Sequence, residues 1–329
     1  MYCKIPEFIG PFKDILPEYV NYQRGLGYDY AAPIVYRLRE MDIFFHERGY
    51  TKPEITEEMY ELWTAHKGNE KKSNQGKRIG AIHGFSKYLI NSGHENIYLG
   101  DPAKGVFKSD FIPYIFSEEE IQRFFSVLKE ELRTEKSRYD VATFTELFSL
   151  YYSCGLRKSE AQHLLIGDID LKTGRIRIMD GKNHISRMIV VSESMRKQLS
   201  TYHDEYCIGC ESDAFMFRNK NGGCFPDQKI YRIYKRILGK TEIPKRKGGQ
   251  TQRIHDLRHT FCVRALETMI KKGYDLYTSL PLLSTYLGHK HITETEYYLR
   301  LLDEHFNSIT KMSDKYAPNL FPKAGDINE

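Results

Sequence analysis

The stretch Leu287-Gly288-His289-Lys290-His291-Ile292-Thr293-Glu294-Thr295-Glu296-Tyr297-Tyr298 sets a histidine and a tyrosine on either side of a predicted helix break. Gly288 is typical of the residue that ends a helix. Thr293, followed by Glu296 three residues later, is a capping box that predicts the start of a second helix. His289 is therefore expected on the turn, and both tyrosines on the first turns of the new helix.

The two adjacent tyrosines are expected to play different parts. Neighbouring helical residues point about 100° apart, so only one tyrosine is expected to face a site shared with His289. Ile292 precedes the capping residue and is placed to pack on Tyr297. Tyr298, nine residues after His289, is left as the candidate nucleophile. The alternative is that Tyr298 is a packing residue, the more usual role of a tyrosine near a helix start.

A second cluster upstream, His255-Asp256-Leu257-Arg258-His259, begins a segment predicted to be helical as far as residue 272. His255 and Arg258 are three residues apart, which places them on one helix face. Asp256 is expected to be a helix N-terminal residue rather than a catalyst. His259 is a candidate to support the site from one turn away, and an ordinary packed histidine is the equal alternative.

Two further basic residues lie nearer the N-terminus. Arg157, in Gly155-Leu156-Arg157-Lys158-Ser159-Glu160, is predicted at a helix start, where Glu160 is placed to orient its guanidinium. A plain surface ion pair is the alternative. Residues 174–191 are typical of a β-hairpin, because two β-rich runs flank the turn-forming residues 180–183. Lys182 lies at this tip, where a lysine is ordinarily solvated.

These basic residues, with the tyrosine and in this order, resemble one protein family. The positions that carry the resemblance are Arg157, Lys182, His255, Arg258, His289 and Tyr298. The family is that of the tyrosine site-specific recombinases, which includes phage integrases and Xer-type enzymes, and the resemblance covers residues 117–298. It implies a mainly α fold with a small β-sheet, in which a helical, SAM-like core-binding domain and a mixed α/β catalytic domain form a C-shaped clamp on DNA.

Changes in local character along the chain predict the domain boundaries. Residues 1–100 are expected to form the core-binding domain, with amphipathic helices at residues 12–24, 30–48, 56–66 and 73–90. Residues 101–116 contain the predicted linker. A capping box at Ser117-Glu118-Glu119-Glu120, with Phe116 and Ile121 as a hydrophobic staple, opens the catalytic domain at residues 117–302.

The C-terminal tail, residues 303–329, contains apolar residues on one predicted helix face. Phe306, Ile309 and Met312 have the spacing that produces such a face. Tails of the family commonly dock on a neighbouring subunit, so the resemblance implies a subunit-exchange helix. A helix that folds back on its own domain is the alternative.

The side chains fit an attack on a DNA phosphodiester. Arg157 and Arg258 would donate charge-assisted hydrogen bonds to the non-bridging oxygens and stabilise the pentavalent transition state. Tyr298 would attack phosphorus and form a 3′-phosphotyrosyl link. Glu160 is expected to orient Arg157, and His259 to support the site without reacting.

The resemblance implies the remaining roles. His255 would act as acid and base, His289 would donate a further hydrogen bond to the phosphate, and Lys182 would protonate the departing 5′-oxygen. The phosphotyrosyl bond conserves the energy of the broken diester, so another 5′-hydroxyl can reverse the reaction without ATP. No metal ion and no other cofactor is expected.

The formal net charge of +5 is compatible with DNA binding without being diagnostic of it. Basic residues are concentrated in two segments, which are predicted to contact the DNA backbone. The first comprises Lys71, Lys72, Lys77 and Arg78, and the second Lys245, Arg246, Lys247 and Arg253. A solvated surface is the usual role of such runs and is the alternative.

The sequence contains no apolar stretch long enough to cross a bilayer and no signal pattern, so a soluble cytoplasmic protein is expected. Six cysteines in a reducing compartment are most simply free thiols. His203, Cys207, Cys210 and Cys224 have a spacing that could hold zinc. A single Cys-x-x-Cys is weak evidence for such a site, so thiols are the favoured interpretation.

The sequence thus predicts a site-specific recombinase of the integrase or transposon type. Its expected partner is double-stranded DNA with a specific core site, bound by a homotetramer that dissociates to monomers or weak assemblies off DNA. Only residues 1–11 precede the first predicted helix, which argues against an added arm-site domain. A type IB topoisomerase and a catalytically idle DNA-binding relative are the alternatives.

Overall fold

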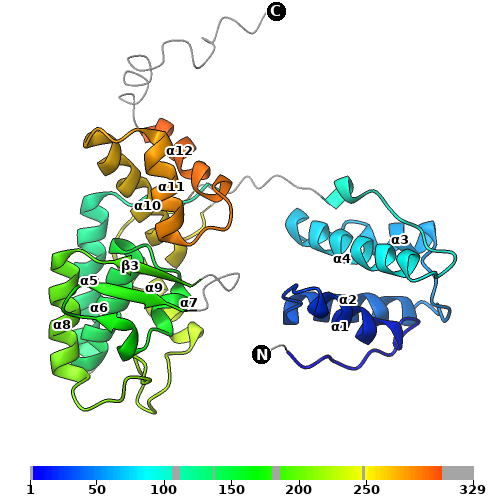
Figure 1. The fold of residues 1–329 in the computed structure, drawn as a ribbon, viewed down its shortest axis with the longest axis horizontal. Coiled ribbons are helices and arrows are strands. Elements are labelled where there is room, and N and C mark those ends of the chain that lie inside the picture. Colours follow the sequence, from blue (N-terminus) through cyan, green and yellow to red (C-terminus); the bar gives the residue numbers. More distant parts are fainter. Residues whose placement is uncertain (1–2, 106–111, 136–137, 180–185, 247–248, 306–329) are drawn as a thin grey trace, which may run out of the picture. The chain divides into compact units, whose positions relative to one another are not determined.

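The computed structural model describes residues 3–105, 112–135, 138–179, 186–246 and 249–305. The chain divides into two compact units, Met1–Phe111 and Ile112–Glu329. We call them unit 1 and unit 2 and consider each by itself (Figure 1). None of the helices in the described ranges has both the length and the apolarity needed to cross a membrane.

Unit 1 is a small helical domain (Figure 1). Its elements are α1 (Ile15–Gly25), α2 (Ala32–His46), α3 (Glu57–Thr64), α4 (Lys72–Asn91) and the 3-10 turn η1 (Pro102–Gly105). The four predicted helices are all present, with ends shifted by a few residues. Their apolar faces meet in one core, where Phe12 packs edge-on against Phe85 and Trp63 is buried. Buried Asp42 accepts hydrogen bonds from the backbone N–H groups of Gly10 and Phe12, which fixes the chain ahead of α1.

Unit 2 is mainly helical and carries one small sheet. Its elements are α5 (Glu118–Glu135), α6 (Arg138–Ser153), α7 (Lys158–Gln162), η2 (Ile166–Asp168), β1 (Ile169–Asp170), β2 (Arg175–Ile178), β3 (Arg187–Val190), α8 (Glu193–Tyr206), α9 (Asp227–Lys240), α10 (Ile254–Lys271), α11 (Leu276–Leu287) and α12 (Thr293–His305). The mainly α fold with a small sheet is therefore confirmed. Figure 1 shows α10, α11 and α12 grouped at one end of the unit, and the sheet with α5, α6 and α8 at the other.

The sheet has the strand order β1-β2-β3, and both pairs are antiparallel. Ile176 pairs with Ile189 and Ile178 pairs with Arg187, so the two β-rich runs of the predicted hairpin do pair. The buried residues of β2 alternate with exposed ones, as expected for a sheet with one face on a core. Residues 180–185, and Lys182 with them, lie outside the described residues.

The predicted capping box at the start of α5 is confirmed. The Ser117 hydroxyl accepts a hydrogen bond from the backbone N–H of Glu120, and the Glu120 carboxylate accepts one from the N–H of Ser117. Phe116 and Ile121 are both buried in the main core of unit 2, in keeping with the predicted staple. This core fixes α5, α6, α8 and α9 around the sheet.

The capping box predicted at Thr293 is wrong by one residue. Thr293 is the first residue of α12, and the Ile292 carbonyl accepts hydrogen bonds from the N–H groups of Thr295 and Glu296. Ile292 is 42% exposed, which contradicts the predicted staple on Tyr297. Because the Ile292 carbonyl already accepts the first hydrogen bonds of the helix, Ile292 occupies the position expected for Thr293, and Thr295 is free to contact His289, whose Nδ1 lies 2.8 Å from its hydroxyl.

Helix α11 ends as the sequence predicts, at a glycine in the left-handed conformation. Gly288 has φ 64°, and a Cβ atom there would lie 2.9 Å from the Cδ of Arg187. A side chain at this position would be disfavoured by the backbone and would displace Arg187. The turn after α11 is therefore closed tightly around that arginine.

Candidate active site

A cavity of about 480 Å³ in unit 2 collects five of the six predicted catalytic residues. These residues come from four separate segments. They are Arg157 at the start of α7, His255 and Arg258 on α10, His289 after α11, and Tyr298 on α12. The sixth, Lys182, lies outside the described residues. The fold thus brings together in one cavity five of the side chains that the sequence predicted to be catalytic.

Arg258 forms the buried floor of this site, with 1% of its surface exposed. Its Nη1 donates to the carbonyl of Gly155 at 2.5 Å, and its Nη2 donates to the carbonyl of Leu287 at 3.1 Å. Gly155 has φ 60°, and a Cβ there would lie 2.3 Å from the ring of Phe261. The left-handed turn at Gly155 therefore exposes a carbonyl that holds this arginine.

Arg157 is held from two sides. Its Nη1 lies 2.8 Å from Oε1 of Glu160, and its Nη2 donates to the carbonyl of Gly288 at 3.2 Å. The backbone N–H of Arg157 donates to Oε2 of Glu160 at 2.8 Å, which caps the short helix α7. The Arg157–Glu160 pair is therefore built into the cavity wall and is not the plain surface pair that the sequence left open.

Sequence reasoning missed Arg187, the first residue of β3. Its Nη1 and Nη2 each lie 2.9 Å from an oxygen of Glu160, which is a bidentate pair. Strand alternation held a signal for it, because Arg187 has the same parity as buried Ile189 and so occupies an inward position. An arginine at an inward strand position needs a buried acid, and Glu160 is that acid.

Burial opposes ionisation of Glu160, but hydrogen bonds and charge from Arg187, and then from Arg157, outweigh it and lower the pKa of the carboxyl to about 2. Arg258 adds a third cation, with Nη1 3.9 Å from Oε2 of Glu160. The carboxylate is therefore charged at neutral pH and lies among three arginines.

The C-terminal end of α11 organises the same three arginines. Three successive carbonyls each accept one guanidinium: that of Tyr286 from Arg187, that of Leu287 from Arg258, and that of Gly288 from Arg157. The last carbonyls of a helix have no partners within the helix and carry the negative end of its dipole. This end of α11 is therefore a natural receptor for cations, and it aligns the arginines along the cavity.

His289 lies on the turn after α11, as predicted. Its Nε2 is 3.2 Å from Nη2 of Arg258, and its Nδ1 is 2.8 Å from the Thr295 hydroxyl. An arginine can only donate, so a neutral ring with its hydrogen on Nδ1 satisfies both contacts. The ring also lies nearly parallel to that of Tyr298, with centroids 6.4 Å apart.

Tyr298 is enclosed, with 3% of its surface exposed, and its hydroxyl lies 3.2 Å from Nδ1 of His259. Burial raises the pKa of Tyr298 well above its usual value, while Arg258 opposes this rise. Burial, together with the nearby cationic groups, lowers the pKa of His259 to about 2. His259 is therefore neutral and in direct contact with the candidate nucleophile, which is a closer role than the sequence indicated.

Tyr297 lines the same cavity, contrary to the expectation that only one of the two tyrosines would face it. It is half-buried, whereas Tyr298 is buried and hydrogen-bonded to His259. His255 is exposed at the rim and packs edge-on against His259, with ring centroids 4.6 Å apart. Asp256 accepts a hydrogen bond from the backbone N–H of Arg253, as expected of a helix N-terminal residue.

The predicted DNA-backbone residues divide into four groups, of which the last is Arg78 alone. Lys71, Lys72, Lys77, Lys245 and Arg253 are exposed. Arg246 is half-buried and donates to the carbonyl of Ile112 at 2.9 Å. Lys247 lies outside the described residues.

Arg78 is a correction to the sequence prediction. It is 3% exposed, its Nε lies 2.9 Å from Oε1 of Glu70, and its Nη groups donate to the carbonyls of Trp63 and Ala65. The guanidinium therefore joins α3 to α4 inside unit 1 and does not point outward to DNA. A run of basic residues on a helix includes inward positions, and sequence composition alone does not separate them.

The six cysteines are free thiols in the structure. In the described part of the chain, no group of three or more His, Cys, Asp or Glu residues is arranged to hold a metal ion. Cys207 is buried, and its Sγ contacts the carbonyl of Met216 at 3.8 Å and Nη1 of Arg218 at 3.5 Å. Its surroundings are those of a packed thiol.

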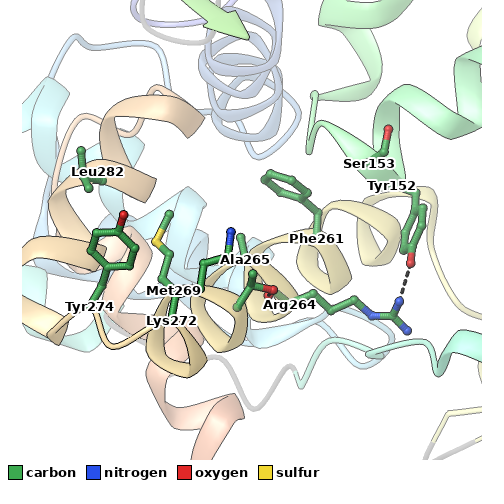
Figure 2. Close-up of a pocket in the computed structure, with 10 residues that line it drawn as sticks. Tyr152, Ser153, Phe261, Arg264, Ala265, Met269, Lys272, Tyr274 and Leu282 are labelled. Carbon is green, nitrogen blue, oxygen red and sulfur yellow. Dashed lines mark hydrogen bonds between the residues drawn. The ribbon is translucent and has the colours of Figure 1, made fainter. Parts of the chain in front are cut away.

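A second cavity of unit 2, of about 630 Å³, contains none of the predicted catalytic residues (Figure 2). It lies along α10, and Phe261, Ala265 and Met269 line it from that helix. Leu282 of α11 lies across from them. Figure 2 shows Arg264 hydrogen-bonded to the hydroxyl of Tyr152 at the end of this largely apolar hollow.

The sequence of unit 2 matches a family of known proteins. The family model described as Phage integrase family matches residues 115–305. The putative integrase/recombinase y4rB of Sinorhizobium fredii is 26% identical over 305 residues, which cover 88% of this chain and 92% of that protein. Tyrosine recombinase XerC of Staphylococcus haemolyticus is 24% identical over 204 residues, which cover 61% of this chain and 62% of that protein.

Solved structures share the fold. The XerH site-specific recombinase bound to difH substrate has a TM-score of 0.60 and 18% identity, with coverage of 93% of this chain and 98% of that one. The Tn1549 transposon integrase in complex with a circular intermediate DNA has a TM-score of 0.61 and 17% identity, with coverage of 88% and 99%.

Proposed function

The chain belongs to the phage integrase family and is a tyrosine site-specific recombinase, an enzyme that breaks and rejoins DNA, and we propose that it cleaves each strand with the hydroxyl of Tyr298. The observation that carries this proposal is the single cavity that holds Arg157, Arg258, His289 and Tyr298. Side chains from four segments converge there, and their arginines can hold the oxygens of one phosphodiester group.

In the proposed reaction, the Tyr298 oxygen attacks phosphorus and the bond from phosphorus to the 5′-oxygen breaks. Arg157 and Arg258 hold the two non-bridging oxygens and balance the charge that develops on them. His255, at the rim of the cavity, accepts the tyrosine proton. His289, with a hydrogen on Nε2 in place of its contact with Arg258, donates a hydrogen bond to the phosphate. A tyrosine hydroxyl needs cationic surroundings and a proton acceptor in order to attack, and these residues supply both.

Lys182 is proposed to donate a proton to the departing 5′-oxygen. The products of cleavage are then a 3′-phosphotyrosyl link and a free 5′-hydroxyl. One phosphodiester is exchanged for another, so a 5′-hydroxyl from a second duplex reverses the step and joins the strands without ATP. The reaction as proposed requires no metal ion.

Contact with the DNA backbone is proposed for the exposed basic residues of each unit. Lys71, Lys72 and Lys77 surround the start of α4, and Lys245 and Arg253 precede the start of α10. Positive side chains at these places would neutralise phosphates and hold the duplex in register, while base contacts define the core site. Arg78 is not part of this surface.

The active assembly is proposed to be a homotetramer on two duplexes, with monomers or weak assemblies off DNA. Leu301 and Leu302 of α12 are buried against α10 and α11, so this part of the helix belongs to its own unit. The apolar residues Phe306, Ile309 and Met312 follow. We propose that they fill the apolar cavity of Figure 2 on a neighbouring copy.

The proposal is tested by trapping the enzyme on DNA in cells. Cells that express the chain are lysed in denaturant, the protein is purified with any DNA bound to it covalently, and that DNA is sequenced. We expect one core sequence, attached through a phosphate on Tyr298 that mass spectrometry of the digested adduct locates. Adducts on random sequences, or on another residue, would contradict the proposal.

The recovered core site then separates recombination from topoisomerase activity. Two plasmids that each carry the site are incubated with the purified enzyme, and a plasmid without it is assayed for loss of supercoils. We expect strand exchange between the two sites and little relaxation of the third plasmid. Relaxation without site dependence or exchange would favour a type IB topoisomerase, and no adduct at all would favour an idle DNA-binding protein.

A further inference from the structure

Arg187 lies behind the cavity wall and does not line the cavity. Its side chain is 7% exposed, and three of its N–H groups are engaged: two on Glu160, both at 2.9 Å, and Nε on the carbonyl of Tyr286 at 2.8 Å. Because this side chain is buried and does not line the cavity, it is not available to a phosphate there. Its effect on the reaction must therefore pass through Glu160 and α11.

Glu160 holds Arg157 by one guanidinium hydrogen bond but Arg187 by two. A lone Arg157 beside a carboxylate would form the stronger bidentate pair, because that geometry satisfies both oxygens. Such a pair would turn the guanidinium edge toward Glu160 and neutralise its charge. Arg187 occupies the bidentate position instead, which leaves N–H groups of Arg157 for the cavity.

The charge balance leads to the same conclusion. Arg157, Arg187 and Arg258 lie within 4 Å of the Glu160 carboxylate, so the cluster carries a net charge of +2. Without Arg187 the net charge would be +1, in a buried setting where each charge acts strongly. A phosphodiester carries one negative charge and gains more negative charge in its transition state. The loss of one positive charge from the cluster would therefore slow the chemical step.

We propose that Arg187 is a positioning residue of strand cleavage, which occupies the Glu160 carboxylate and so keeps Arg157 free and correctly aimed at one non-bridging oxygen of the scissile phosphate. This inference rests on the proposed function, because it assigns Arg157 to that phosphate. The inference extends the proposed function by naming the buried arginine that holds Arg157 in this arrangement.

The test uses the full-length chain and a nicked suicide substrate built on the core site recovered from trapping. Arg187→Gln is compared with wild type in single-turnover cleavage and in DNA binding. We expect binding within about twofold of wild type and a rate lower by roughly 10-fold to 100-fold, since a catalytic group misplaced by about 1 Å costs up to 100-fold. Arg175→Gln, on the exposed face of β2, is the matched control for charge loss and is expected to cleave at nearly the wild-type rate.

A neutral methylphosphonate at the scissile position identifies the oxygen concerned. Each of its two diastereomers lacks one non-bridging oxygen, and Arg157→Ala and Arg258→Ala define which diastereomer reports on which arginine. We expect Arg187→Gln to show the diastereomer pattern of Arg157→Ala. A loss of equal size on the phosphodiester and on both diastereomers would mean a general structural role and would overturn the proposal.

A second comparison measures the effect of Arg187→Gln in a Glu160→Gln background. Glu160→Gln removes the carboxylate that competes for Arg157, so Arg187→Gln should cost less in that background than in wild type. An equal loss of cleavage rate in both backgrounds would overturn the proposal.

A further variant covers the case in which Arg187→Gln folds poorly. If Arg187→Gln fails to bind DNA, Arg187→Lys, which keeps the charge without bidentate geometry, is assayed on the same diastereomers. Wild-type protein that forms no adduct contradicts the proposed function, whereas normal cleavage by the Arg187 variants contradicts this inference alone.

Discussion

The hydroxyl of Tyr298 lies 3.2 Å from Nδ1 of His259. Both side chains are buried, at 3% and 9% exposed, although Tyr298 lines the active-site cavity. The pKa of His259 lies far below that of an ordinary histidine, chiefly because of burial. His259 is therefore a poor proton acceptor for the attack. Its contact with the Tyr298 hydroxyl instead holds the tyrosine ring in place while the phosphate binds to the arginines of the site.

Replacement of the two adjacent tyrosines tests which one is the nucleophile. Tyr298→Phe should bind the core site with near-normal affinity, because arginines and lysines supply most of the binding energy, and should form no covalent adduct on the suicide substrate. Tyr297→Phe keeps the ring and should form the adduct. A denaturing gel that resolves protein–DNA adducts makes the comparison.

The opposite outcome is informative because both tyrosines line the cavity. An adduct with Tyr298→Phe but none with Tyr297→Phe would assign the attack to Tyr297. The hydrogen bond of Tyr298 to His259 would then be a packing contact.

The buried neutral state of His259 predicts a specific loss of stability in acid. The folded chain keeps His259 neutral down to a pKa of about 2, whereas the unfolded chain binds a proton below pH about 6.5. The free energy of unfolding should therefore fall by up to about 1.4 kcal/mol for each pH unit below 6.5. His259→Gln removes this contribution, so its stability curve should be flatter between pH 6.5 and 5.

The measurement is denaturant unfolding of wild type and variant at several pH values. Burial raises the pKa of Glu146 to about 7, so this carboxyl titrates in the same range. The comparison is therefore the difference between variant and wild type, in which Glu146 cancels. His259→Asn, a second side chain that does not titrate, should give the same difference, and parallel curves for all three proteins would rule the effect out.

Local patterns in the sequence were sufficient for much of the fold. The capping box at Ser117 forms as predicted because its two partners are three residues apart and need no tertiary contact. Gly288 ends α11 in the left-handed conformation, which glycine adopts most readily, so the residue type alone predicts this helix end. The cluster around Arg258 was found because its residues lie on one helix face. Each of these signals is contained within one turn of helix.

The parts that were missed depend on contacts between distant segments. Arg187 takes its role from Glu160 and from the end of α11, and neither is near it in sequence. The helix that contains Tyr298 begins one residue off the predicted cap, with the Ile292 carbonyl as its first acceptor, and Thr295 contacts His289 across the turn. Arg78 was assigned to the surface by its basic neighbours, although Glu70 and two carbonyls hold it inside unit 1.

Lys182 is tested through the leaving group, since the residue lies outside the described ranges. Lys182→Ala should cleave normal DNA slowly, because the departing 5′-oxygen then lacks its proton donor. It should recover on DNA with sulfur at the bridging 5′ position, because a thiolate leaves without a proton. Single-turnover rates on the two substrates are compared. Equal slowness on both would move the acid role elsewhere, with His255 the next candidate.

Removal of residues 306–329 tests how subunits are linked. If Phe306 and its apolar neighbours fill the cavity beside Ala265 on another copy, the truncated chain should bind single sites normally but lose synapsis of two sites. The melting temperature of the DNA-free truncated chain should not change, because a tail that docks between copies does not stabilise a monomer. Gel-shift titration, a two-site synapsis assay and thermal unfolding measure the three quantities.

Ala265→Tyr provides the matched variant, because it fills the apolar cavity from the receiving side and leaves the tail intact. It should show the same synapsis defect as the truncation, and the two changes combined should be no worse than either, since both remove one contact. A truncated chain that melts at lower temperature would place the tail on its own unit. Full recombination by the truncated chain would exclude the tail from assembly altogether.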